Sequence, residues 1–151
     1  MRLTAHTDYA LRILMFAAAR ARAGGDATRF SVQIAAKAYG LSQNHVMKIV
    51  QRLAGTGYLR STRGRGGGLE LGVNPAEVRL GALVRFLEQD QTLVACFGCE
   101  EPCRLGGQCA LERALHEALE AFYTSLDRFT LADLVLSPRV LAGLERHLIL
   151  T

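Results

Sequence analysis

A glycine-rich segment between two short strand-like runs places the strongest limit on the fold of this chain. Residues 58–63 and 69–73 have the residue pattern of strands, and Gly64-Arg65-Gly66-Gly67-Gly68 joins them. Such a hairpin is too rich in glycine for ordinary packing, but its backbone can approach a phosphate or enter a narrow groove. Arg63 and Arg65 supply cations that the negative potential of a DNA minor groove attracts. A nucleotide-binding phosphate loop is a weaker interpretation, because neither a Gly-Lys-Ser/Thr ending nor a strand-to-helix transition follows.

Three helices are predicted before this hairpin. The first follows Thr7 as its N-cap and ends at Gly24-Gly25, and its spacing buries one face made of Ala10, Ile13, Leu14, Ala17, Ala18 and Ala21. A second, short helix starts after Ser31 and stops at Tyr39-Gly40, and a third starts after Ser42. A short helix, a glycine-containing turn and a polar-faced helix form the helix-turn-helix pattern. With the hairpin as its wing, this region predicts a winged helix.

The third helix has an apolar face and an outward face that is a candidate for contact with DNA. The apolar side chains are those of Val46, Ile49, Val50 and Leu53. The first residues of such a helix reach base edges, so the candidates for base readout are Gln43, Asn44, His45 and Lys48. Gln51 and Arg52 lie a turn later and are better placed for phosphates. The alternative is an ordinary solvated helix face, which has the same pattern.

The charge distribution favours double-stranded DNA as the partner of the N-terminal half. Residues 1–73 contain eleven Lys/Arg and three Asp/Glu, whereas residues 74–151 contain seven and eleven, so the two halves carry +8 and −4. A strongly basic half-chain is the electrostatic footprint expected for nucleic acid, although a solvated basic face has the same composition.

All four cysteines lie within fourteen residues, at Cys96, Cys99, Cys103 and Cys109. Residues 1–8 lack the apolar core of a signal peptide, and the longest apolar run, residues 13–19, is too short to span a bilayer. We therefore expect a cytoplasmic protein with no membrane partner. In a reducing cytosol, clustered cysteines bind metal or perform redox chemistry more often than they form disulfides.

A long amphipathic helix is predicted from Cys109 to about Arg128. Its apolar stripe consists of Leu111, Leu115, Leu119, Phe122 and Leu126. So small a domain cannot bury this stripe by itself, and a twofold homodimer that presents two DNA-reading domains to two half-sites would cover it. Packing of the stripe within its own chain is the alternative. Thr130 and Asp133 have the pattern of a helix N-cap, and Ser137-Pro138 can open a last helix.

Together the patterns predict a mainly α-helical chain with one small β-hairpin. It comprises a winged helix-turn-helix domain over residues 1–75, a linker helix and cysteine loop over residues 76–109, and a dimerisation helix with C-terminal helices over residues 110–151. The four histidines are scattered, and no Ser/His/Asp or paired-carboxylate arrangement stands out. We therefore do not expect an enzyme.

Four segments together resemble a known family of regulators. Residues 7–12, 39–48 and 63–69 and the cysteine loop occur in the order and at the distances found in the iron–sulfur winged-helix repressors. Within that family, which includes IscR, the chain resembles the nitric-oxide-sensing NsrR group, and the resemblance covers nearly the whole chain. It implies a homodimeric transcriptional repressor that binds operator DNA with an intact iron–sulfur cluster and releases it when nitric oxide nitrosylates the cluster.

The resemblance also implies which thiolates bind the cluster. Family members use three cysteines, and the last two match Cys103 and Cys109. Cys96 fits the upstream position better than Cys99, which stays an alternate ligand, and a site with all four cysteines is left open. The cluster expected from the resemblance is 4Fe–4S, with 2Fe–2S as the alternative.

The fourth ligand implied by the resemblance is Asp8 from the other subunit. IscR-like members have a histidine at the position of Glu112, so this departure favours the NsrR arrangement, in which an aspartate of the first helix completes the site. A carboxylate is a harder ligand than a thiolate and could leave its iron more accessible to nitric oxide. The plain alternative is that Asp8 favours the positive end of its helix dipole.

Three other functions are alternatives on sequence grounds. The first is an iron or redox sensor of the same family. The second is a DNA-binding regulator with zinc on the four cysteines, although zinc sites usually arrange cysteines as two close couples. The third is an iron–sulfur electron carrier, which would leave the helix-turn-helix and the wing unexplained.

Overall fold

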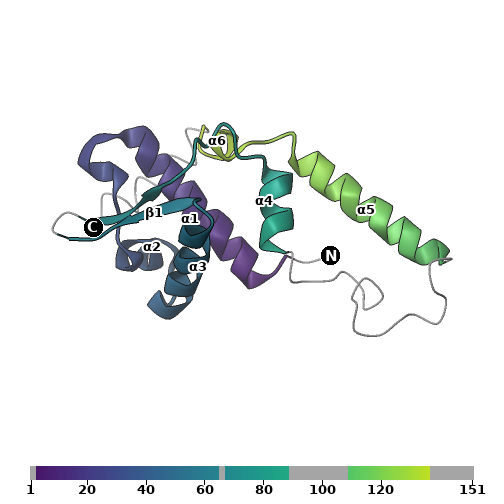
Figure 1. The fold of residues 1–151 in the computed structure, drawn as a ribbon, viewed down its shortest axis with the longest axis horizontal. Helices are drawn as coiled ribbons and strands as arrows, with labels where there is room; N and C mark the ends of the chain where they lie inside the picture. The colour runs from purple at the N-terminus through teal and green to yellow at the C-terminus, as the bar shows by residue number, and fades with distance from the viewer. Residues whose placement is uncertain (1–2, 65–66, 89–108, 137–151) are drawn as a thin grey trace.

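The described part of the chain consists of helices arranged around one two-stranded hairpin (Figure 1). A computed structural model of the 151-residue chain describes residues 3–64, 67–88 and 109–136. The elements in chain order are α1 (Ala5–Ala23), the 3-10 helix η1 (Gly25–Thr28), α2 (Val32–Tyr39), α3 (Gln43–Gly55), β1 (Leu59–Thr62), β2 (Gly68–Leu71), α4 (Leu80–Leu87), α5 (Ala110–Leu126) and α6 (Leu131–Leu134). This order confirms the predicted mainly helical fold with a small hairpin.

Helix α1 is the central element of the hydrophobic core. It packs against α3, β2, α4 and α6, so one helix supports both the helix-turn-helix and the elements that follow the wing. The predicted apolar face is buried except for Ala21, which is exposed. Phe16 is also fully buried, because its ring packs edge-on against that of Phe30 with the centroids 5.2 Å apart.

The first turn of α1 corrects one prediction. The N-cap is Thr4, whose hydroxyl oxygen accepts a hydrogen bond from the Thr7 amide at 3.2 Å. Thr7 itself is fully buried inside the first turn, so its prediction as N-cap is wrong. Thr4 and Thr7 both carry a hydroxyl group that could cap the helix. Because Thr7 is packed inside the protein, Thr4 is the residue that caps α1.

The helix-turn-helix and the wing form as predicted. Ser31 and Ser42 cap α2 and α3, and Gly40 ends α2 in the left-handed conformation with φ 62°. In the wing, β1 and β2 pair antiparallel, and Phe30 adds an isolated antiparallel bridge to Leu69. Leu69 is buried, so the base of the wing is fixed to the core.

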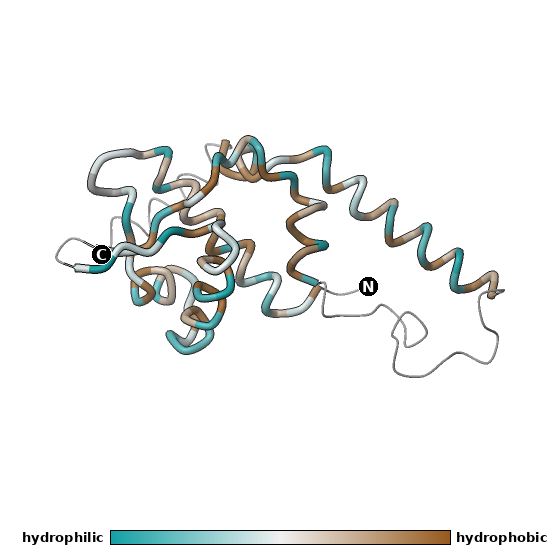
Figure 2. Tube along the Cα trace, in the orientation of Figure 1, coloured by the Kyte–Doolittle hydropathy of each residue, from teal (hydrophilic) through white to brown (hydrophobic). Residues whose placement is uncertain are grey.

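Helix α5 extends away from the other described helices, as Figure 1 shows. Its C-terminal part contacts α4: Tyr123 is 8% exposed, and Arg85 of α4 lies 4.3 Å from the centre of its ring. Leu111, near the other end of α5, is 65% exposed. Figure 2 shows hydrophobic residues recurring along the whole of this projecting helix. The exposure of Leu111 shows that the described residues cover its apolar stripe only in part.

The contact between α4 and α5 depends on Gly81. A Cβ at this position would overlap the backbone oxygen of Tyr123 and the carboxyl group of Asp127, which accepts a hydrogen bond from the Ala82 amide at 2.9 Å. We expect Gly81→Ala to lower the free energy of unfolding by about 1–3 kcal/mol, because overpacking displaces one helix from the other. Denaturant unfolding measures the change. Gly55→Ala is the matched control, since nothing lies within 4 Å of its Cβ, and an equal loss in both variants would contradict this account.

A pH-dependent ion pair supports the same contact. Arg85 binds Glu120 through two hydrogen bonds of 2.6 and 2.7 Å, and these lower the pKa of Glu120 below its ordinary value of 4.5. Because the folded pKa is depressed, the stabilisation is present above pH 4.5 and is lost as the pH falls through the folded pKa. We expect the melting temperature to fall slightly as the solution is acidified, and we expect this fall to be smaller in Glu120→Gln. The same pH dependence of the melting temperature in wild type and variant would contradict this contribution of the ion pair.

Candidate functional site

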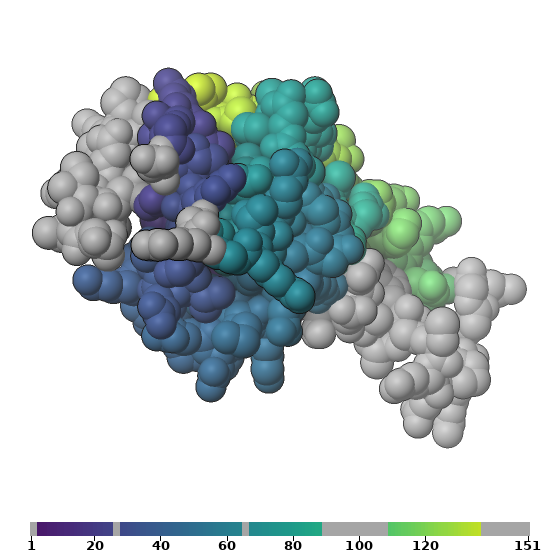
Figure 3. All heavy atoms as spheres, turned by 60° about the vertical axis from the view of Figure 1, so that its left-hand side comes forward, coloured from purple at the N-terminus to yellow at the C-terminus, as the bar shows by residue number. Residues whose placement is uncertain are grey.

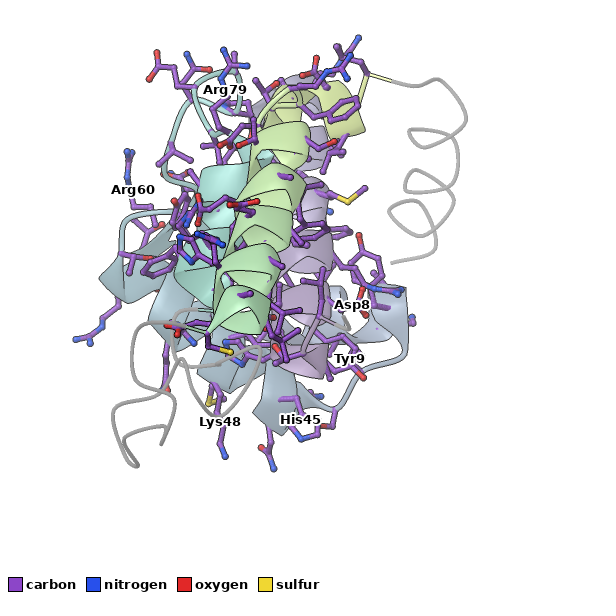
Figure 4. The ribbon with its side chains drawn as sticks, turned by 90° about the vertical axis from the view of Figure 1, so that its right-hand side faces the viewer. Asp8, Tyr9, His45, Lys48, Arg60 and Arg79 are labelled. Atoms are coloured by element: carbon purple, nitrogen blue, oxygen red, sulfur yellow. The ribbon has the colours of Figure 1, made fainter. Side chains whose placement is uncertain are left out.

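The exposed face of α3 presents the side chains predicted to read DNA bases. Ser42 accepts a hydrogen bond from the His45 amide at 3.3 Å, which fixes the first turn of the helix. The exposed side chains of α3 include Gln43, Asn44, His45, Lys48 and Gln51. Figure 4 shows His45 and Lys48 projecting from the lower end of the molecule. The fold therefore leaves these candidates accessible to a large ligand.

One exposed residue of this face was not predicted. Met47 is 46% exposed and lies between the predicted base-reading positions. Its helical spacing from Gln43 and Gln51 places all three on one face, and that spacing is the signal by which it could have been found. Methionine is more often buried than exposed, so the residue type alone predicts a buried position.

Arg52 is turned toward another helix. Its guanidinium donates a hydrogen bond to the backbone oxygen of Phe86 at 3.3 Å and lies 5.5 Å from the centre of that ring. The side chain that was predicted to contact phosphate is thus engaged at the interface of α3 with α4. Sequence spacing gives the position of Arg52 on its helix but not which neighbour occupies that side.

The wing adds positive charge next to α3. Arg63 is exposed, whereas Arg65 lies outside the described residues. Arg29 and Arg60 flank Glu70, each with a nitrogen 3.5 Å from one of its carboxylate oxygens, and both arginines are about half exposed or more, at 52% and 65%. Neither arginine was singled out from the sequence, because Arg60 is placed beside Glu70 by the pairing of β1 with β2, and Arg29 by the bridge between Phe30 and Leu69. In Figure 3 the hairpin lies beside α2 and α3 on one face of the molecule.

The candidate metal ligands are described only in part. Cys109 immediately precedes α5, is half-buried and forms no disulfide. Cys96, Cys99 and Cys103 lie outside the described residues. Within residues 3–64, 67–88 and 109–136, no group of three His, Cys, Asp or Glu side chains could hold a metal.

Asp8 lies in the first turn of α1 and is paired within its own helix. Arg12 donates from Nε to both carboxylate oxygens, at 3.0 and 3.1 Å, and this hydrogen bonding raises the pKa of Arg12. The Asp8 side chain is 45% exposed and that of Arg12 is 50% exposed, so solvent screens the ion pair. A second binding partner can therefore reach the Asp8 carboxylate. A metal bound by Asp8 would have to share the carboxylate with Arg12 or displace it.

The residue that precedes the cysteine segment is hydrogen-bonded to the N-cap of α1. Glu88, the last described residue before the segment, accepts hydrogen bonds from the amide and the hydroxyl of Thr4 at 3.0 and 2.9 Å. The N-terminus of α1, which carries Asp8, and the C-terminal end of α4 are therefore neighbours within one chain.

The donor set fits an iron–sulfur cluster. Four cysteines on one short segment supply the soft thiolate ligands that such clusters use, and the half-buried Cys109 stands where that segment joins a rigid helix. An exposed carboxylate at Asp8 adds a harder oxygen donor that another subunit can approach.

The comparisons with known proteins identify the family. Residues 3–137 match the profile of the Rrf2 family, described as iron-dependent transcriptional regulators. The chain belongs to the Rrf2 family. It is 43% identical over 136 residues to the HTH-type transcriptional regulator NsrR of Geobacillus kaustophilus and 42% identical over 136 residues to that of Bacillus subtilis, in each case covering 89% of this chain and 90% of the relative.

A solved structure supports the same assignment. The chain resembles the global cysteine regulator CymR of B. subtilis with a TM-score of 0.68 and 27% identity, over 89% of this chain and 96% of that one. As an Rrf2 protein, the chain is a winged-helix transcriptional regulator, which confirms the resemblance and the fold predicted from sequence. The family is described as one of transcriptional regulators, and the two relatives named above are HTH-type transcriptional regulators. None of the helices in the described ranges is long and apolar enough to cross a membrane.

Proposed function

We propose that this Rrf2 protein is a nitric-oxide-responsive transcriptional repressor of the NsrR type. As a homodimer it binds operator DNA with its iron–sulfur cluster intact and releases the DNA when nitric oxide nitrosylates the cluster. The observation that carries the proposal is the identity of 42–43% with regulators named NsrR over about nine tenths of the chain, combined with the clustered cysteines and Asp8.

The cluster ligands proposed are Cys96, Cys103 and Cys109 of one subunit and Asp8 of the other, with Cys99 as the alternate for Cys96. When bound, the cluster supplies iron that reacts with nitric oxide, and 4Fe–4S is the form we favour over 2Fe–2S. Asp8 is suited to its role because its carboxylate is half exposed on the first turn of α1. Loss of this ligand would disconnect the sensor segment of one subunit from the DNA-reading domain of the other.

The DNA contacts proposed divide between α3 and the wing. Gln43, Asn44, His45 and Lys48 would contact base edges, and Gln51 would lie near the backbone. Arg63 and Arg65 of the wing would enter or border the minor groove, where the potential is most negative. The exposure of the described members of this set supports the assignment.

The homodimer proposed is formed by α5. Leu115, Leu119 and Phe122 are only half-buried within one chain, and Leu111 is exposed, so a second copy of the helix would cover the stripe. We expect the purified protein to have twice the monomer mass in solution and Leu115→Glu to shift it toward monomer, because a charge would be buried at the interface. Light scattering measures the mass, and Glu117→Gln on the exposed surface of α5 is the control. A monomeric wild type would contradict the dimer.

One experiment tests the function directly. The protein is purified without oxygen, its iron, sulfide and visible absorption are measured, and nitric oxide is titrated while binding is followed to a duplex selected by the protein from a random pool. We expect a brown protein that loses its cluster absorption and its DNA affinity together. A colourless zinc protein that ignores nitric oxide would overturn the proposal, and a cluster protein that responds instead to oxygen or iron would favour a redox or iron sensor of the same family.

A further inference from the structure

The last turn of α4 is held from two sides. Arg52 of α3 donates to the backbone oxygen of Phe86 at 3.3 Å and lies over its ring at 5.5 Å. The ring of Tyr58, just before β1, packs against the same phenyl ring with the centroids 5.9 Å apart. Glu88, two residues after Phe86, accepts the two hydrogen bonds from Thr4 of the α1 N-cap.

The Arg52 contact has the chemistry of an anchor at a helix C-terminus. The last carbonyl groups of a helix lack partners within the helix, and a cation near them is favoured by the helix dipole. A planar guanidinium can donate to the Phe86 carbonyl while it lies over the phenyl ring, which a lysine ammonium cannot reproduce with the same geometry. The contact thus fixes α3 against α4 through one specific side chain.

The two helices joined by Arg52 have different roles. α3 carries the exposed side chains proposed to read DNA, whereas α4 leads directly into residues 89–108, which contain three of the four cysteines. A change that moves the last turn of α4 would therefore act on Phe86 and, through Arg52, on the orientation of α3. The Thr4 contact with Glu88 ties the same turn to the helix that carries Asp8.

We infer that Arg52 is a positioning residue that couples the state of the cysteine segment to the DNA-reading helix. It does so through the last turn of α4 and does not contact phosphate. The inference rests on the proposed cluster-dependent DNA binding. Coupling between two sites requires an element whose arrangement both of them bias. This turn contacts Arg52 of α3 and is followed in the sequence by the cysteine segment.

The test compares wild type, Arg52→Met and Phe86→Leu as full-length proteins. For each, affinity for the selected duplex is measured with and without the cluster and over a range of salt concentrations. We expect both variants to retain cluster absorption and to lower the ratio of the two affinities about threefold or more. The slope of log affinity against log salt should stay at the wild-type value. A lost phosphate contact would instead lower that slope by about one and leave the ratio unchanged.

Two control variants distinguish coupling from simple weakening. Gln51→Met changes the exposed neighbour of Arg52 and should keep the wild-type affinity ratio, whereas Lys48→Met should reduce affinity in both cluster states alike. An Arg52→Met protein with the wild-type ratio, or with a reduced salt slope, would overturn the inference. If circular dichroism shows that Arg52→Met does not fold, the affinity ratio of Phe86→Leu tests the inference instead. Phe86 is the partner of Arg52 and is only half-buried on α4, so its replacement by leucine should leave the fold intact. Equal affinity of wild type in both cluster states would refute the proposed function itself, and the inference with it.

Discussion

Cys109→Ala is expected to abolish iron–sulfur cluster binding and with it most operator affinity. Cys109 immediately precedes α5, so its thiolate is held where the cysteine segment joins a rigid helix, and alanine removes the ligand without adding bulk. We expect iron and sulfide to fall to background in anaerobically purified protein. Affinity for the selected duplex should fall by roughly 5- to 150-fold, the usual range for coupling between two binding sites.

The other cysteines extend this prediction to the choice of ligands. Cys103→Ala should match Cys109→Ala, whereas of Cys96→Ala and Cys99→Ala only the first should lose the cluster. Helical content measured by circular dichroism controls for misfolding, since Cys109 lies outside the hydrophobic core of the winged helix. Full cluster loading in Cys109→Ala would exclude the proposed ligand set. Loss of the cluster in all four variants would show a four-cysteine site. Loss of the cluster in Cys99→Ala but not in Cys96→Ala would make Cys99 the upstream ligand in place of Cys96.

Most predictions that depend on local sequence were confirmed, although the N-cap of α1 was not. Ser31 and Ser42 cap their helices, Gly40 ends α2 in the left-handed region, and Thr130 forms a capping box with Asp133. Each of these depends on residues within one turn of each other, so the interaction is present in the sequence pattern itself. The predicted hairpin differs from the observed strands only at its ends, where such boundaries are least sharply defined.

The features that sequence could not give depend on contacts between distant segments. Thr4 rather than Thr7 caps α1, and Phe16 is buried while Ala21 is not, because the neighbours of α1 decide which side chains are covered. The position of Arg52 likewise required knowing that Phe86, 34 residues later in the sequence, lies in the last turn of α4 beside it. The predicted opening of a last helix at Ser137-Pro138 lies outside the described residues.

Asp8→Ala is expected to weaken cluster retention with little effect on folding. The Asp8 pair with Arg12 is an exposed pair within one helix, so its loss should change the free energy of unfolding by only about 0.5 kcal/mol. If Asp8 is a cluster ligand, its removal should speed cluster loss in air and blunt the effect of nitric oxide on DNA binding. Arg12→Ala is the matched control, because it breaks the same ion pair but leaves the carboxylate. Equal behaviour of the two variants would mean that Asp8 acts only through Arg12.

A mixed dimer tests whether Asp8 acts across the subunit interface. One subunit carries Asp8→Ala and its partner carries Cys109→Ala, with different affinity tags so that only the mixed dimer is purified. If each site combines the cysteines of one subunit with Asp8 of the other, one site is intact and the other lacks both groups. We then expect half of the wild-type iron, with wild-type sensitivity to nitric oxide. If both groups come from the same subunit, each site lacks one of them, and the iron should be held no better than in Asp8→Ala. Such a result would exclude a bridge between the subunits, because the single intact site exists only when Asp8 reaches across.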